Sequence, residues 1–127
     1  QLTRLDKFVA RRREIADAYD AALADVALDV PGRLPGAESS WHLYVIRLHD
    51  QSRHRQAFEE LRANGIGVNL HYIPVHLQPY YRQFGFGPGD FPASENYYAR
   101  AISGPMYPDL TDEMQATVVA AVTEVIG

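Results

Sequence analysis

The sequence contains no cysteine and only one lysine, Lys7. Without cysteine, the 127-residue chain cannot form a disulfide, a thiolate metal site or a cysteine nucleophile. Thiol-free composition fits the cytoplasm, where we expect the protein to act. No apolar run approaches the roughly 20 residues of a transmembrane helix, and the first residues lack the pattern of a secretion signal. We therefore expect no membrane partner.

Excess positive charge is also missing. The net charge is −4 and the isoelectric point is near 5.7, whereas proteins that bind nucleic-acid phosphates carry clustered basic residues. The only basic run is Arg11, Arg12 and Arg13, and such a run at helical spacing is typical of a solvated helix face. We expect no nucleic-acid partner. A hydrophobic fraction of 46% is ordinary for one globular domain.

Apolar residues recur every three or four positions in the first part of the chain and predict a long helix over residues 1–28. The stripe consists of Leu2, Leu5, Val9, Ala16, Tyr19, Leu23 and Val26, with Arg12 at its one polar step. A helix of some 25 residues is about 38 Å long, more than the core of a small domain needs. We expect part of the stripe to face a surface outside this chain. Prolines and glycines between Pro31 and Gly36 predict the following loop.

The remainder, residues 38–127, reads as an α+β body. Strands are predicted at residues 40–49 and 66–73. A short third strand is predicted within 102–108, where Pro105 and Pro108 confine it to an edge or to a strand end. Helices are predicted at 53–65, 78–85 and 93–102, and a final helix is capped by Thr111. These elements favour a small antiparallel sheet of about three strands, with helices packed on one face.

The segment GVNLHYIPVHLQPYYR, residues 67–82, concentrates histidine and aromatic side chains. His71 and His76 are five positions apart with Pro74 between them, so they do not form the two-histidine metal motif of a helix. A third ligand from His42 or Asp90 would require a coincidence of folding, and we predict no metal site. The sequence also lacks the Gly-x-Ser-x-Gly elbow of serine hydrolases and a glycine-rich phosphate loop.

His71 and His76 have different predicted environments. For His71, a strand residue, we expect a hydrogen bond between the imidazole and a neighbouring backbone group. His76 follows the proline that ends the strand, and we expect it to lie on an exposed loop where it can reach a ligand. Tyr80 and Tyr81 are spaced so that at least one should enter the core. From spacing alone, we predict that the segment forms the rim of a pocket, and the spacing does not specify a reaction.

The segment GIGVNLHYIPVHLQPYYRQFG, with WHLYVIRL and AFEELRANG before it and ISGPMYPDLTDEM after it, resembles the C-terminal domain of DegT-type sugar aminotransferases. These are pyridoxal-phosphate enzymes of the aspartate-aminotransferase fold type, and the resemblance covers essentially the whole chain. The stretch HYIPVHLQPYYR is similar to the branch that aminates a UDP-linked 4-keto-6-deoxy-N-acetylhexosamine in pseudaminic-acid biosynthesis.

The resemblance implies a pyridoxal 5′-phosphate cofactor, a nucleotide-sugar substrate, an amino-acid donor such as glutamate, and a homodimer. Residue by residue, it implies that His76 approaches cofactor and sugar, with His71, Tyr72 and Asn69 as further pocket residues. It implies no catalytic residue in this chain, because Lys7 lacks the family's His-Lys context and the cofactor-binding domain is not part of the sequence. We therefore expect this chain alone to be inactive and to supply a wall of the substrate pocket.

One residue departs from the pattern of the resembling family. Gly104 stands where relatives often carry a larger residue before the proline, so the role of that strand is open. Two other functions also stay open at this point: a stand-alone ligand-binding module without catalysis, and an oligomerisation module assembled through the first helix.

Overall fold

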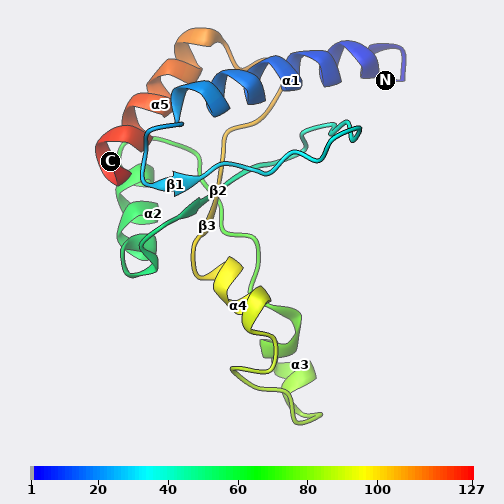
Figure 1. Ribbon diagram of the computed structural model, residues 1–127, viewed down its shortest axis with the longest axis vertical. Coiled ribbons are helices and arrows are strands. Elements are labelled where there is room, and N and C mark those ends of the chain that lie inside the picture. The colour runs from blue at the N-terminus through cyan, green and yellow to red at the C-terminus, as the bar shows by residue number, and fades with distance from the viewer. Residues whose placement is uncertain (1) are drawn as a thin grey trace.

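The computed structural model describes residues 2–127 and forms a helix-covered sheet with a projecting arm (Figure 1). The elements follow in the order η1 (Leu2–Arg4), α1 (Leu5–Ala22), β1 (Leu28–Asp29), β2 (Tyr44–Leu48), η2 (Gln51–Arg53), α2 (His54–Ala63), η3 (Val75–Leu77), α3 (Pro79–Arg82), α4 (Pro92–Tyr98), β3 (Ala101–Gly104) and α5 (Asp112–Ile126). Those labelled η are single 3₁₀ turns.

The sheet has three antiparallel strands in the order β1-β2-β3. In β2, Tyr44, Ile46 and Leu48 are buried while the intervening residues are less so, which is the alternation expected of a strand covered on one face. In β3, Ile102 lies opposite Ile46. The predicted α+β fold with a three-stranded antiparallel sheet is therefore confirmed.

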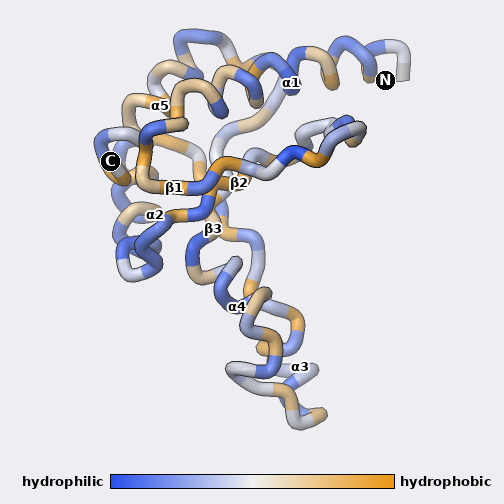
Figure 2. Tube along the Cα trace, in the orientation of Figure 1, coloured by the Kyte–Doolittle hydropathy of each residue, from blue (hydrophilic) through white to orange (hydrophobic). Residues whose placement is uncertain are grey.

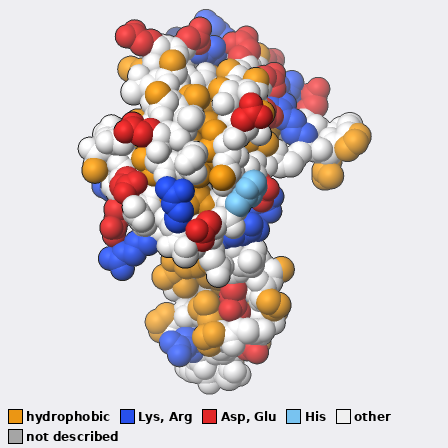
Figure 3. All heavy atoms as spheres, turned by 60° about the vertical axis from the view of Figure 1, so that its left-hand side comes forward, with side chains coloured by type: hydrophobic (Ala, Val, Ile, Leu, Met, Phe, Trp, Pro, Cys, Tyr) orange, Lys and Arg blue, Asp and Glu red, His pale blue; other side chains and the backbone are white. Residues whose placement is uncertain are grey.

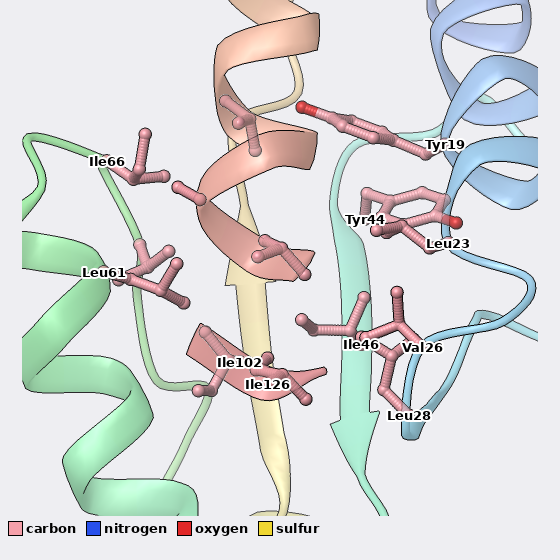
Figure 4. Close-up of a cluster of buried hydrophobic side chains, with 14 of the residues drawn as sticks. Tyr19, Leu23, Val26, Leu28, Tyr44, Ile46, Leu61, Ile66, Ile102 and Ile126 are labelled. Carbon is pink, nitrogen blue, oxygen red and sulfur yellow. The ribbon is translucent and has the colours of Figure 1, made fainter. Parts of the chain in front are cut away.

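The core lies between this sheet and helices α1, α2 and α5. Figure 4 shows Tyr19 of α1 beside Tyr44 of β2, and Ile126 of α5 beside Ile102 of β3, with Leu61 of α2 facing the same core. The rings of Tyr19 and Tyr44 pack with their centroids 4.8 Å apart. Burial of these side chains supplies the main driving force for folding the body.

The first helix is shorter than the sequence pattern predicts. It ends at Ala22 rather than at residue 28, and Val26 and Leu28 remain buried although they lie in a turn and in β1. Because a turn and a short strand can bury residues at the same spacing, the apolar stripe overstates the length of the helix. Its first turn is open to solvent, where the side chain of Leu5 is half exposed.

The strand predicted at residues 66–73 is wrong apart from one position. Asn69 forms a single antiparallel bridge with Ser103, and the chain then leaves the sheet. The predicted third strand is found as β3, which stops at Gly104 because Pro105 has no N–H to continue the ladder.

Residues 73–99, which we call the arm, contain η3, α3 and α4 and project from the sheet at the end opposite α1 (Figure 1). The tube in Figure 2 alternates between apolar and polar residues along this segment, and Figure 3 shows hydrophobic side chains on the surface of the same lower lobe. Tyr80 and Tyr81 both lie on that surface. The prediction that one of them enters the core is therefore wrong, because the short helix α3 packs on the arm and not on the sheet.

Candidate functional site

His76 lies inside the arm rather than on an exposed loop. It is the middle residue of η3, which follows the buried Pro74, and its side chain is only 7% exposed. The Nε2 atom lies 2.8 Å from Oε1 of Glu95 on α4. The predicted exposure of His76 is thus wrong, because the arm folds back and brings α4 against the turn.

Glu95 gathers hydrogen bonds from several directions. Besides the contact with His76, the backbone N–H of Gly89 donates to both carboxylate oxygens at 2.9 and 3.0 Å, and the N–H of Phe91 donates to Oε1 at 3.3 Å. Gly89 has a φ of 95°, a conformation that suits glycine. The hydrogen bond from His76, followed by those from the two backbone amides, lowers the pKa of Glu95.

Beside this pair is a largely apolar cavity of about 380 Å³, which we call the arm cavity. It is lined by Val75, His76, Tyr81, Phe86, Phe91 and Ser94. The imidazole of His76 packs against the ring of Phe91 with their centroids 4.8 Å apart. The arm cavity thus combines an apolar wall with one imidazole, a composition common in small-molecule sites.

His71 and Tyr72 lie where the chain enters the arm. Both ring nitrogens of His71 are buried and have no hydrogen-bond partner within residues 2–127, so the predicted hydrogen bond to the backbone is wrong. The segment turns away after its single bridge, which leaves no neighbouring strand to supply the acceptor. The ring of His71 meets that of Tyr72 edge-on, with centroids 4.6 Å apart, and Tyr72 itself is 74% exposed.

Asn69 lines a different cavity, of about 520 Å³, next to the sheet. Its backbone exchanges two hydrogen bonds with Ser103, at 3.1 and 2.9 Å, while its side chain remains exposed. His42, Gly104 and Tyr107 line the same cavity. Within residues 2–127, and apart from Gly104 and its two chain neighbours, no atom lies within 4 Å of the position that a Cβ on Gly104 would occupy, so a larger side chain there would point into open space.

The structure therefore does not gather the four predicted residues in one pocket. His76 lines the arm cavity, Asn69 lines the cavity beside the sheet, and His71 and Tyr72 lie in the connection between them. The sequence reasoning missed Glu95 and Phe91. A usable signal was present, since a glutamate in the first turn of a predicted helix, after a glycine-rich loop, is a natural acceptor for loop amides.

Among residues 2–127, no cluster of three or more histidine, aspartate or glutamate side chains is arranged to hold a metal ion. In the same range, no helix is both long and apolar enough to cross a membrane.

The residues of this chain do not by themselves fit a complete pyridoxal-phosphate site. Such a site needs a lysine amine, and Lys7 is exposed in the first turn of α1. Helix α1 lies at the opposite end of the long axis from the arm (Figure 1). The cavities described above do not include Lys7 in their walls. The candidate residues offer imidazole, amide and phenol groups, which suit one side of a shared pocket.

Comparison with known proteins identifies the family. The chain is 37% identical to the spore coat polysaccharide biosynthesis protein SpsC of Bacillus subtilis over 99% of its length, and 36% identical, again over 99%, to a dTDP-3-amino-3,4,6-trideoxy-alpha-D-glucose transaminase of Micromonospora megalomicea. It spans about a third of each relative, 34% in both cases.

Solved structures of sugar aminotransferases also resemble this chain. The PLP-form of the putative sugar aminotransferase Spr1654 from Streptococcus pneumoniae superposes with a TM-score of 0.91 at 28% identity, over 98% of this chain and 33% of that one. PseC of Helicobacter pylori, an aminotransferase involved in the biosynthesis of pseudoaminic acid, gives 0.91 at 27% identity, over 99% of this chain and 34% of that one. The model of the DegT/DnrJ/EryC1/StrS aminotransferase family matches residues 1–123, and the chain belongs to this family of pyridoxal-phosphate-dependent sugar aminotransferases.

Proposed function

We propose that this chain is the C-terminal small domain of an enzyme that transfers an amino group from glutamate to the C4 ketone of a UDP-linked 4-keto-6-deoxy-N-acetylhexosamine. In that reaction the ketone becomes a primary amine and glutamate becomes the corresponding 2-keto acid. The enzyme is a homodimer, and this domain supplies one wall of its substrate pocket through His76, His71, Tyr72 and Asn69.

The observation that carries the proposal is the family match over residues 1–123, because it spans the whole segment that holds both candidate cavities. The match of the fold to PseC supports the C4-aminating branch, as does the motif HYIPVHLQPYYR. The relatives are about three times as long as this chain, which leaves room in them for a separate cofactor-binding domain.

Amination at a different carbon of the sugar is supported by a separate comparison. The relative from Micromonospora megalomicea is named for a 3-amino sugar carried by dTDP, and at 36% identity it is more similar in sequence than PseC is at 27%. Amination at C3 of a dTDP-linked sugar is therefore the alternative substrate class.

Pyridoxal phosphate, when bound in the complete enzyme, supplies the electron sink that makes amino transfer between two carbons possible. The residues of this chain bind and orient the sugar, and they exclude water from it. The aromatic walls of the arm cavity keep water from the bound sugar, and the imidazole of His76 offers a directed hydrogen bond to it. The exposed ring of Tyr72 offers a flat apolar surface for a sugar or a neighbouring domain.

The test compares this chain with a longer protein that begins upstream in the same gene. Each is incubated with pyridoxal phosphate, glutamate and either the UDP-linked 4-keto sugar or a dTDP-linked 3-keto sugar, and the amino sugar is detected by mass spectrometry. We expect the longer protein to aminate the 4-keto sugar, and this chain to give neither product nor an imine absorbance near about 420 nm. Product from the 3-keto sugar only would shift the assignment to the alternative class. Amination by this chain alone would contradict its assignment as a pocket wall.

A further inference from the structure

The contact between His76 and Glu95 determines which ring nitrogen of His76 carries the proton. An ionised carboxylate can only accept hydrogen bonds, so the ring nitrogen that faces it must carry the proton. Because Nε2 is the atom that lies 2.8 Å from Glu95, a neutral His76 has its hydrogen on Nε2 and an unprotonated Nδ1. One nitrogen is thereby a fixed donor and the other a fixed acceptor.

The second ring nitrogen is left accessible. Within residues 2–127, Nδ1 of His76 makes no hydrogen bond, yet it is not among the buried polar atoms that lack a partner. His71 differs, because both of its nitrogens are enclosed without a partner. Since His76 lines the arm cavity, the little exposure that its side chain retains is available to a molecule bound there.

The carboxylate is itself held in place. The N–H groups of Gly89 and Phe91 fix Glu95 from the loop side, and the ring of Phe91 packs against the imidazole that Glu95 contacts. The imidazole is therefore restrained at its Nε2 edge and on one face. Restraint of this kind is what a residue requires if it is to present one atom to a ligand in a defined direction.

We propose that Glu95 is a positioning residue that holds His76 as its Nε2–H tautomer, so that Nδ1 accepts a hydrogen bond from a hydroxyl or amine of the ligand in the arm cavity. The identity of that ligand, a sugar nucleotide, rests on the proposed function. The tautomer itself does not, and it can be measured in this chain without cofactor or substrate.

The first experiment is nitrogen NMR on the chain labelled with ¹⁵N-histidine, at about pH 9, where an ordinary imidazole is neutral. His76 is assigned by the loss of its signals in His76→Gln. We expect a protonated Nε2 and an unprotonated Nδ1 in the wild type. Glu95→Leu keeps roughly the size of the side chain but removes the oxygen that faces Nε2, so we expect averaged signals from both tautomers. Glu59→Gln removes an exposed carboxylate paired with Arg55 on α2 and should leave the His76 signals unchanged.

An Nδ1–H tautomer, or averaged signals in the wild type, would overturn the proposal, and this result does not depend on how a Glu95 variant folds. The second experiment is kinetic and uses the longer protein described above. We expect Glu95→Leu to lower kcat by between about 10- and 100-fold with a smaller change in KM, because Nδ1 of His76 is misplaced in the transition state.

The outcomes separate the two proposals. A wild-type protein that aminates neither sugar contradicts the proposed function, and the NMR result then decides the role of Glu95 alone. An active wild type with an equally active Glu95→Leu overturns the positioning role and leaves the proposed function intact.

Discussion

At the scale of single residues, Glu95 links the conformation of the arm to pH. Its pKa lies below the ordinary value of 4.5, chiefly because His76 donates to it and also because Gly89 and Phe91 do. A lowered pKa in the folded state means that the ionised form is stabilised by folding. This stabilisation is complete above the ordinary pKa and is lost as the pH falls through the lowered value.

We therefore predict that acid loosens the arm before it unfolds the body. Between neutral pH and about pH 5 the amides of the arm should keep their protection, and below the ordinary pKa they should exchange progressively faster while those of β2 remain protected. Hydrogen exchange read by mass spectrometry at a series of pH values, corrected for the intrinsic rate, measures this. In Glu95→Gln the arm should lose this pH dependence, and an unchanged dependence in that variant would assign it to another group.

The sequence pointed to His76 but not to the group that holds it. Glu95 is 19 positions further along the chain, and the two meet only because the loop after α3 reverses direction. Periodicity within a helix or strand carries no information about such an encounter. His71 was misjudged for a related reason, since its expected backbone partner required a strand that does not form.

At the scale of elements, α5 follows its sequence signals closely. Thr111 precedes the helix with an extended backbone, and its Oγ1 accepts a hydrogen bond from the N–H of Met114 at 3.2 Å. Asp112 and Glu113 occupy the first turn, where acidic side chains complement the helix dipole. The predicted cap is confirmed because its interactions are local in sequence.

We predict that Thr111→Ala destabilises the protein by about 1 kcal/mol, through loss of this cap. The measurement is urea-induced unfolding followed by circular dichroism. Thr123→Ala is the matched control, because Thr123 is an exposed residue inside the same helix and alanine has the higher helix propensity. Equal destabilisation by the two substitutions would show that the cap contributes nothing.

Strands were harder to predict than helices. In β2 the alternation of buried and less buried residues has a partner strand on each side, so the pattern and the structure agree. Residues 66–73 carry a similar pattern, but only Asn69 pairs. Conversely, β1 contains two residues, too few for any periodic signal, and it was hidden in the expected helix. Strand pairing depends on distant neighbours that local sequence does not specify.

At the scale of the whole molecule, body and arm are organised differently. The body has a continuous core drawn from α1, α2, α5 and the sheet, and this arrangement follows from the order and type of elements read in the sequence. The arm has short helices and a small cluster of aromatic rings around His76 and Phe91. Its shape was not predicted, because loops and single turns lack a hydrophobic period.

We predict that the two parts respond separately to a change in the core. Leu61 is fully buried, and Leu61→Ala should lower the free energy of unfolding by about 2–5 kcal/mol. Hydrogen exchange of β2 amides should accelerate accordingly, while exchange in the arm changes little because it proceeds by local opening. Leu34→Ala removes a largely exposed leucine and serves as the control. Equal acceleration in arm and body would mean that they unfold as one unit.

The two edges of the sheet have a consequence for self-association. On one side β1 offers only two residues, and Asp29 there is surrounded by Arg47, His49 and Arg100. On the other side the bridge from Asn69 occupies β3, and Pro105 follows it at once. Neither border presents a long row of free backbone groups to a foreign strand, so the sheet resists growth into fibrils by strand addition.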